Sequence, residues 1–168
     1  MENQKIKMEN KNEIKNKNDW YNHQSGIIIS IDGFENEKVY KDLSKIIFKN
    51  DKSDDFLFGK YEFVLDVNST IYPFFSKNSI IHWGLSKNHF KTNQLLKNTN
   101  LKNYDYISNG ILYAIDPITS IKDEKYKDYQ NILYFSFFGL LGTLYTNFDI
   151  SNFHIGQSVC FYCIIKTV

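Results

Sequence analysis

The chain of 168 residues contains no arginine, so all twenty of its basic residues are lysines. Without a guanidinium group, a protein cannot make the planar two-point contacts with phosphate or guanine that specific nucleic-acid binding favours. Lysine alone still neutralises phosphate, but the formal net charge is only +1, which leaves little positive field to attract a polyanion. We therefore expect no nucleic-acid partner.

Cysteine and long hydrophobic runs are also scarce. Two cysteines do not make the disulfide framework of a small secreted domain. The longest apolar run, near residues 132–145, is too short to span a bilayer and contains two glycines. The N-terminal residues are polar and contain no apolar core of a secretory signal. These features predict a cytoplasmic protein without a membrane partner.

Aromatic residues are abundant, with fourteen Phe and twelve Tyr, and they make up 17% of the chain. Because each ring can bury about 150–250 Å², they are sufficient to build a core. Residues 1–19 are a low-complexity Lys/Asn/Glu segment that has too few apolar side chains to offset its ordering entropy. We expect a flexible polar tail over 1–19 and a single domain over 20–168.

Hydrophobic patterns predict strands and two helices along this domain. The expected strands are 26–31, 61–68, 80–86, 110–115, 131–138 with a continuation over 139–147 after a kink, and 158–167. Val39, Leu43 and Ile46 recur at helical spacing, which predicts a long helix over 35–50. Residues 89–100 suggest a second, short helix. The predicted fold is α+β, a mostly antiparallel sheet of five to six strands with both helices packed on one face.

Two cysteines three positions apart, Cys160 and Cys163, have a spacing found in redox and metal sites. Neither a second cysteine pair nor a nearby histidine pair completes the four ligands of a structural zinc site. We therefore expect buried structural cysteines, no metal and no cofactor. His23, His82, His89 and His154 lack the spacings typical of metal ligands, which favours histidines at the surface or in hydrogen bonds.

One pattern indicates an enzyme. His82-x-Gly-x-Ser86 recurs as His154-x-Gly-x-Ser158. Two histidines, one acting as a base and the other as an acid, with hydroxyls that hold phosphate oxygens, are what a phosphoester hydrolase needs. A small phosphoesterase that uses His82 and His154 is therefore the alternative function, although a chance recurrence explains the pattern as well.

Other residues indicate a binding surface. Trp83, Tyr104, Tyr106 and Tyr113 are typical interface anchors if they are exposed and ordinary core if they are buried. The carboxylates of Asp116, Asp123, Glu124 and Asp128 follow one another on and after a turn. Such a turn either keeps the protein soluble or steers it toward a basic partner.

Three motifs carry a family resemblance. They are Gly84-Leu-Ser-Lys-Asn88-His89, then Ser108-Asn-Gly-Ile-Leu-Tyr-Ala-Ile-Asp116, and then Asn131-Ile-Leu-Tyr-Phe-Ser-Phe-Phe-Gly139. Their order over residues 26–149 resembles immunity protein family 7 of the polymorphic-toxin systems. The resemblance implies a cytoplasmic protein that binds and neutralises one cognate toxin domain without chemistry of its own. The binding surface we expect includes Trp83, Asn88, His89, Tyr113 and Asp116.

Overall fold

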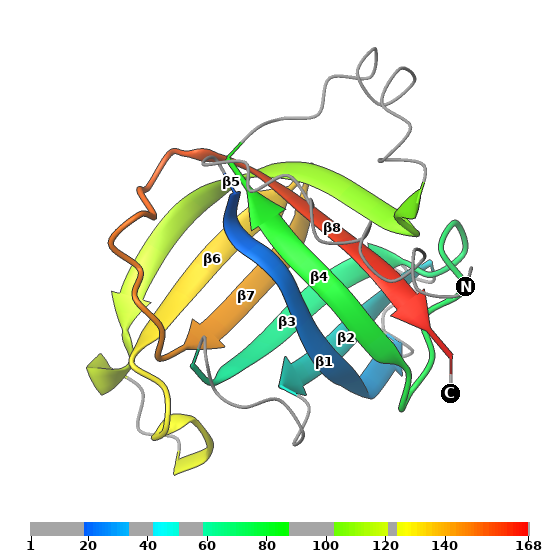
Figure 1. The fold of residues 1–168 in the computed structure, drawn as a ribbon, viewed down its shortest axis with the longest axis horizontal. Coiled ribbons are helices and arrows are strands. Elements are labelled where there is room, and N and C mark those ends of the chain that lie inside the picture. Colours follow the sequence, from blue (N-terminus) through cyan, green and yellow to red (C-terminus); the bar gives the residue numbers. More distant parts are fainter. Residues whose placement is uncertain (1–18, 34–41, 51–58, 88–102, 121–123, 168) are drawn as a thin grey trace, which may run out of the picture.

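Eight β-strands form one closed antiparallel barrel in the computed structural model, which describes residues 19–33, 42–50, 59–87, 103–120 and 124–167 (Figure 1). The strands are β1 (Asp19–Gly33), β2 (Leu43–Asn50), β3 (Tyr61–Asn68), β4 (Ile80–Ser86), β5 (Tyr106–Pro117), β6 (Asn131–Phe137), β7 (Leu140–Thr146) and β8 (Ser158–Lys166). Two single-turn 3-10 helices, η2 (Ile118–Ser120) and η3 (Glu124–Tyr126), follow β5. Closure removes the exposed sheet edges along which open β-sheets aggregate.

The predicted α+β fold is wrong, because residues 43–50 of the expected long helix form strand β2. Ser44, Ile46 and Phe48 alternate into the interior, and this period of two is equally present in the sequence. The β-branched and aromatic residues of this segment suit a strand, and pairing with both neighbours overrides the helical spacing. Asp42 lies in a turn before β2, and residues 35–41 of that helix and the short helix predicted over 89–100 lie outside the described residues.

Each half of the barrel is a Greek key. Strands β1, β2 and β3 form a meander, and β4 returns to pair with β1; β5, β6 and β7 repeat this arrangement, with β8 beside β5. The two halves join where β3 pairs with β7 and where β4 pairs with β8. The equivalent strands are β1 and β5, β2 and β6, β3 and β7, and β4 and β8. When each strand is exchanged for its equivalent, the closed order β1-β2-β3-β7-β6-β5-β8-β4 is the same, read around the barrel in the opposite direction.

Local details repeat with the topology. The carbonyl of Ile28 accepts a hydrogen bond of 2.8 Å from the amide of Asn78, and the carbonyl of Leu112 accepts one of 2.7 Å from Gly156. Asn78 and Gly156 both have a positive φ, 70° and 85°. The pairing with the next strand shifts directly after Ile28 in β1 and directly after Leu112 in β5. The barrel therefore has a pseudo-twofold axis that relates the halves residue by residue.

The registers define the equivalent positions. Beyond the two bulges, the paired row Ser30–Ile47–Val64 corresponds to the row Ala114–Tyr134–Thr143. Val64 and Thr143 pair directly across the junction of β3 and β7, as residues on the pseudo-twofold axis must.

Aromatic rings fill the barrel. The side chains of Phe48, Phe63, Trp83, Phe135 and Phe161 are fully buried. Trp83 stacks on Phe161, its equivalent in the other half, with ring centroids 6.1 Å apart, and meets Phe63 edge-on at 5.3 Å. Such pairs contribute about 0.5–1.5 kcal/mol each beyond their buried area. The interior is therefore the core of the protein.

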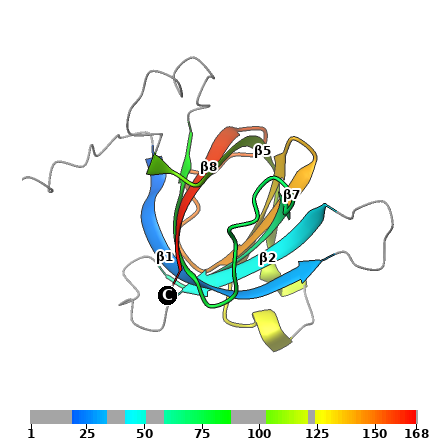
Figure 2. The ribbon, with the colours of Figure 1, turned by 90° about the vertical axis from the view of Figure 1, so that its right-hand side faces the viewer.

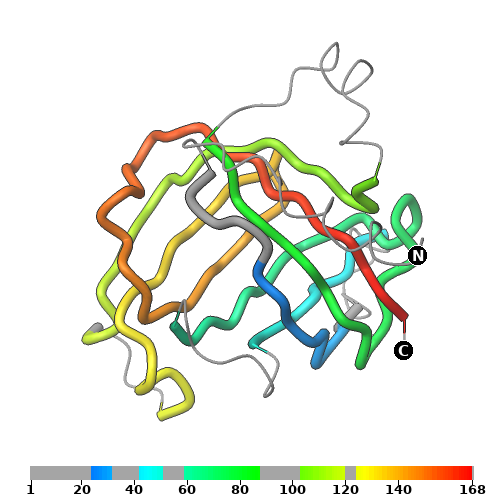
Figure 3. The backbone as a smooth tube through the Cα atoms, in the orientation of Figure 1, coloured from blue at the N-terminus to red at the C-terminus, as the bar shows by residue number. Residues whose placement is uncertain are grey.

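The connections that follow β3 and β7 cover the two ends of this core. Residues 69–79 cross one end, as the view along the barrel shows (Figure 2), and the Tyr72 ring lies 4.8 Å from the Tyr106 ring there. Residues 147–157 run from β7 to β8 (Figure 3) and bury Phe148 and Phe153 at the other end. None of the helices among the described residues is long and apolar enough to cross a membrane.

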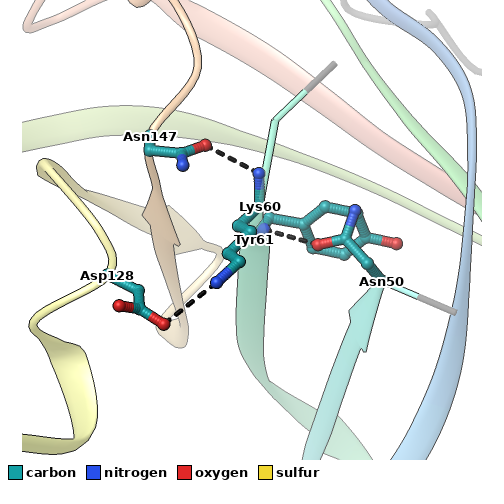
Figure 4. Close-up of polar contacts among 5 residues, drawn as sticks. All are labelled: Asn50, Lys60, Tyr61, Asp128 and Asn147. Atoms are coloured by element: carbon teal, nitrogen blue, oxygen red, sulfur yellow. Dashed lines mark hydrogen bonds and ion pairs between the residues drawn. The ribbon is translucent and has the colours of Figure 1, made fainter. Parts of the chain in front are cut away.

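Asparagine side chains fix the beginning of β3 (Figure 4). Asn50 at the end of β2 accepts a hydrogen bond of 2.6 Å from the Tyr61 amide, and Asn147 accepts one of 2.6 Å from the Lys60 amide. The Lys60 ammonium group also donates to the carboxylate of Asp128 at 3.0 Å. Three segments that are distant in sequence therefore meet at this end of the barrel.

Candidate functional site

Three adjacent strands present an uncharged outer surface, which we call the β5–β7 face. Its members are Ile111, Tyr113, Tyr134, Ser136, Leu141 and Thr143. Ile111, Ser136 and Leu141 form one row across the strands, and Tyr134 pairs with Thr143 in the next row. Ile111 is 47% exposed, Tyr113 46% and Leu141 47%. Exposed neighbouring apolar side chains of this kind often mark an interaction site.

The other large hydrophobic side chains that are exposed among the described residues border this face. Phe138, 87% exposed, occupies the turn between β6 and β7. Ile71, 65% exposed, follows the end of β3, which runs beside the beginning of β7. Ile155, 64% exposed, precedes Gly156, whose amide donates to Leu112 of β5. Four of the six large hydrophobic side chains that are exposed among the described residues therefore lie on β5, on β7 or in the turn before β7.

The equivalent surface of the first half is charged at two of its six positions, and the other four hold Ile27, Ile29, Ile47 and Val64. Ser136 and Leu141 correspond to Lys49 and Glu62, which also face each other across two strands. Ile132 and Tyr145 likewise correspond to the ion pair that Lys45 and Asp66 make at 3.0 Å. The same architecture thus forms with charged side chains at these positions, so the fold itself does not require the β5–β7 face to be uncharged.

Carboxylates lie at the borders of the face. Asp66 accepts a hydrogen bond of 3.2 Å from the Leu141 amide and the bond from Lys45. Asp116 is exposed at the end of β5 and makes no ion pair among the described residues. Partial burial and, secondarily, the charge of Asp116 raise the pKa of Tyr134 above its ordinary value. An apolar centre with a polar border is the usual anatomy of a protein interface.

The structure brings together two of the five expected binding residues. Tyr113 belongs to the face, where its ring lies 6.1 Å from that of Tyr134, and Asp116 borders it. Trp83 is fully buried in the core and therefore supports the barrel from inside. Asn88 and His89 lie outside the described residues.

The acidic segment after β5 is mostly tied to the barrel. Lys125 donates a hydrogen bond of 2.9 Å to the buried carboxylate of Glu62, and this bond raises the pKa of Lys125. Glu124 pairs with Lys127, and Asp128 pairs with Lys60. Asp123 lies outside the described residues. Of the three described carboxylates in this set, Asp116 is thus the one that makes no ion pair with another described residue.

A tyrosine cluster packs beside this segment. Tyr126 stacks on Tyr145 with ring centroids 4.1 Å apart, and Tyr129 lies 6.1 Å from Tyr145. Burial raises the pKa of Tyr129 to about 12, and burial also raises that of Tyr145. The rings cover Ile132 on the outside of β6, which closes this end of the β5–β7 face.

The two His/Ser motifs lie in different settings. His82 sits on β4 opposite Ile164 of β8, whereas His154 lies in the connection before β8. The stretch of β8 from Ser158 to Ile164 alone spans roughly 20 Å. The structure therefore does not bring the two imidazoles together around one phosphate-sized site.

Cys160 and Cys163 are both buried thiols that form no disulfide, which agrees with the expected buried structural cysteines. Burial raises the pKa of the Cys163 thiol well above its ordinary value, so this group stays protonated at neutral pH. Within the described parts of the chain, no three His, Cys, Asp or Glu side chains gather into a group that could hold a metal ion.

Sequence reasoning missed Tyr134, Leu141 and Phe138. Residues 139–147 are a separate strand, not the continuation of the preceding one, because a two-residue turn reverses the chain at Phe138-Gly139. Glycine in the second position of such a turn is a hairpin signal, but phenylalanine in the first position hides it. Once the hairpin is placed, alternation along residues 140–146 puts Leu141 and Thr143 outside.

Fold and surface together define a filled, closed β-barrel that has one uncharged, partly exposed outer face. No family model matches the chain, and no curated protein matches it.

Proposed function

We propose that the protein is a non-catalytic binding module that acts as an immunity-type inhibitor and neutralises a toxin domain by binding to it. The observation that carries the proposal is the β5–β7 face. Its side chains are uncharged and three of them are nearly half exposed, while two of the six equivalent positions in the first half hold Lys49 and Glu62. The filled interior supports a working surface on the outside of the barrel.

The chemistry of this face suits a protein partner. Tyrosine and aliphatic side chains give large apolar contacts at a small entropic cost, and charged residues are depleted from the centres of protein interfaces. Asp116 at the border adds a carboxylate that favours a partner with a basic residue opposite it. The toxin as the kind of partner is the part of the proposal that comes from the family resemblance.

Co-expression with a toxin encoded beside this gene tests the proposal. The wild-type protein is expected to restore growth and to co-purify with the toxin domain. A Leu141→Lys variant, which puts a charge into the row Ile111–Ser136–Leu141 of the face, is expected to weaken the complex by roughly 30-fold or more, the scale of an interface hot spot.

A control for Leu141→Lys comes from the pseudo-symmetry. Lys49 is equivalent to Ser136, so Lys49→Ser makes the two halves alike at this position. This variant should leave binding of the toxin domain unchanged. Loss of binding in Lys49→Ser with retention in Leu141→Lys would place the interface on the other half. A neighbouring gene that encodes no toxin, or growth that is not restored, would refute the toxin as partner.

A further inference from the structure

The turn between β6 and β7 places a bulky aromatic residue in an unfavourable backbone conformation. Phe137 pairs with Leu140, so Phe138 and Gly139 are the two residues of the turn. Both have positive φ angles, 53° and 91°, as in a type I′ turn. This turn favours Asn, Asp or Gly in its first position, and a bulky residue at positive φ is a rare, strained choice.

The Phe138 ring makes few packing contacts within the protein that could offset this strain. Its side chain is 87% exposed, whereas Phe135 and Phe137 of the same strand are buried in the core. A phenylalanine can bury roughly 200 Å² on contact with a partner. Strain that local packing does not compensate is typical of residues kept for binding.

We propose that Phe138 is the anchor by which this protein docks, and that its ring inserts into an apolar concave pocket on the surface of a folded partner protein. This inference rests on the proposed function and names the residue and the partner surface for it. Leu141, exposed two residues after the turn, contacts the rim of the pocket, and the β5–β7 face packs against the surface beside it.

The size of the face argues against a second copy of this chain as the occupant. Three strands spaced about 4.8 Å apart, over about four residues of about 3.3 Å, give a flat footprint on the order of 200 Å². A stable interface buries roughly 800 Å² on each partner. Two flat faces packed together reach about a quarter of this area. A pocket that surrounds the protruding ring adds roughly 200 Å² more, and a larger folded partner can supply the remaining contacts beyond the edges of the face.

The test compares the wild-type protein with Phe138→Asn and Phe138→Tyr. Asparagine suits the type I′ turn, so Phe138→Asn is expected to raise the melting temperature by about 2–4 °C. The same variant is expected to bind the toxin domain of the neighbouring gene at least roughly 30-fold more weakly in calorimetry. Phe138→Tyr keeps the ring and should match the wild-type protein in both measurements.

Each alternative result overturns the inference in its own way. If Phe138→Asn binds the toxin domain as tightly as the wild type, the anchor role is wrong while the proposed function stands. A wild-type protein that does not bind the toxin domain overturns both. A lower melting temperature of Phe138→Asn removes the strain argument. If the wild-type protein dimerises in sedimentation and Phe138→Asn does not, a second copy of the chain replaces the pocket as the partner surface. If the wild-type protein floats with phosphatidylcholine vesicles and Phe138→Asn does not, a lipid surface replaces it.

Discussion

At the scale of single residues, the aromatic side chains divide between the interior and the surface according to what each can pack against. Gly142 illustrates how closely the interior is filled. A methyl group added at Gly142 would lie 2.8 Å from the ring of Phe137 and 3.1 Å from that of Phe63. Phe63 and Gly142 are equivalent positions of the two halves, so a large residue in one is accommodated by the smallest in the other.

Tyr106 provides a prediction at the same scale. It is buried beside Tyr72 and Phe75, and this burial raises its pKa to about 12 from the ordinary value of 10.0. The folded protein therefore keeps a proton that the unfolded chain releases between pH 10 and about 12, so the stability it contributes is complete below pH 10 and is lost as pH rises through about 12. We expect the free energy of unfolding to fall over this range by on the order of 2 kcal/mol from Tyr106 alone.

Urea unfolding of Tyr106→Phe at several pH values between 9 and about 12 measures this effect. The variant is expected to lose less stability with rising pH than the wild type, because phenylalanine has no proton to release. Tyr113→Phe is the control, because Tyr113 is exposed, and it should follow the wild-type curve. Parallel curves for all three proteins would contradict the assignment.

At the scale of elements, the beginning of β3 depends on side chains from other strands. The Tyr61 amide has Asn50 Oδ1 as its acceptor, at 2.6 Å. We expect Asn50→Ala to lower the free energy of unfolding by about 1–2 kcal/mol, because a partly buried donor then loses its partner. Asn152→Ala, at an exposed position of the connection before β8, is expected to change stability by less than about 0.5 kcal/mol. Equal effects in thermal unfolding would show that the acceptor is unimportant.

The success of the sequence-based predictions also depends on the kind of element. Periodicity located β3, β4 and β8 nearly to the residue, because alternation and apolar composition are local properties. It assigned residues 43–50 to a helix, since a segment with several adjacent apolar residues fits both periods. The closure of the barrel depends on pairings such as β4 with β1, between residues far apart in sequence, and no local pattern encodes them.

The candidate site shows the same limit. Tyr113 and Asp116 were identified because aromatic and acidic residues stand out in a sequence. The exposure that decides whether such a residue binds or packs is set by the barrel: Tyr113 points outward, while Trp83 lies at the centre of the core. Leu141 has no distinctive chemistry, and its importance comes entirely from the strand positions beside it.

At the scale of the whole molecule, the two Greek keys complete each other. Each half alone would leave two open sheet edges, β3 and β4 in the first half and β7 and β8 in the second. We expect residues 1–95 and 96–168, expressed as separate chains, to co-elute as one folded complex in gel filtration, with the circular dichroism of the intact protein. Exposed edges make each fragment alone prone to aggregate or to pair with itself.

A matched division inside a meander, at Phe138-Gly139, is the control, because it separates two strands of the same Greek key and should reassemble less well. A second half that folds by itself as a stable monomer would contradict the expectation. Self-pairing of the second half would be informative too, since Thr143 lies on the pseudo-twofold axis and would then face its own copy.

The pseudo-twofold axis separates two tasks that most small domains must combine. Because either half meets the same geometric demands, one half can keep the barrel correctly paired while the outer surface of the other changes. A lineage that had to follow a changing opponent would then need substitutions at only a few outward positions of β5, β6 and β7, and the barrel beneath them would not have to be reinvented each time.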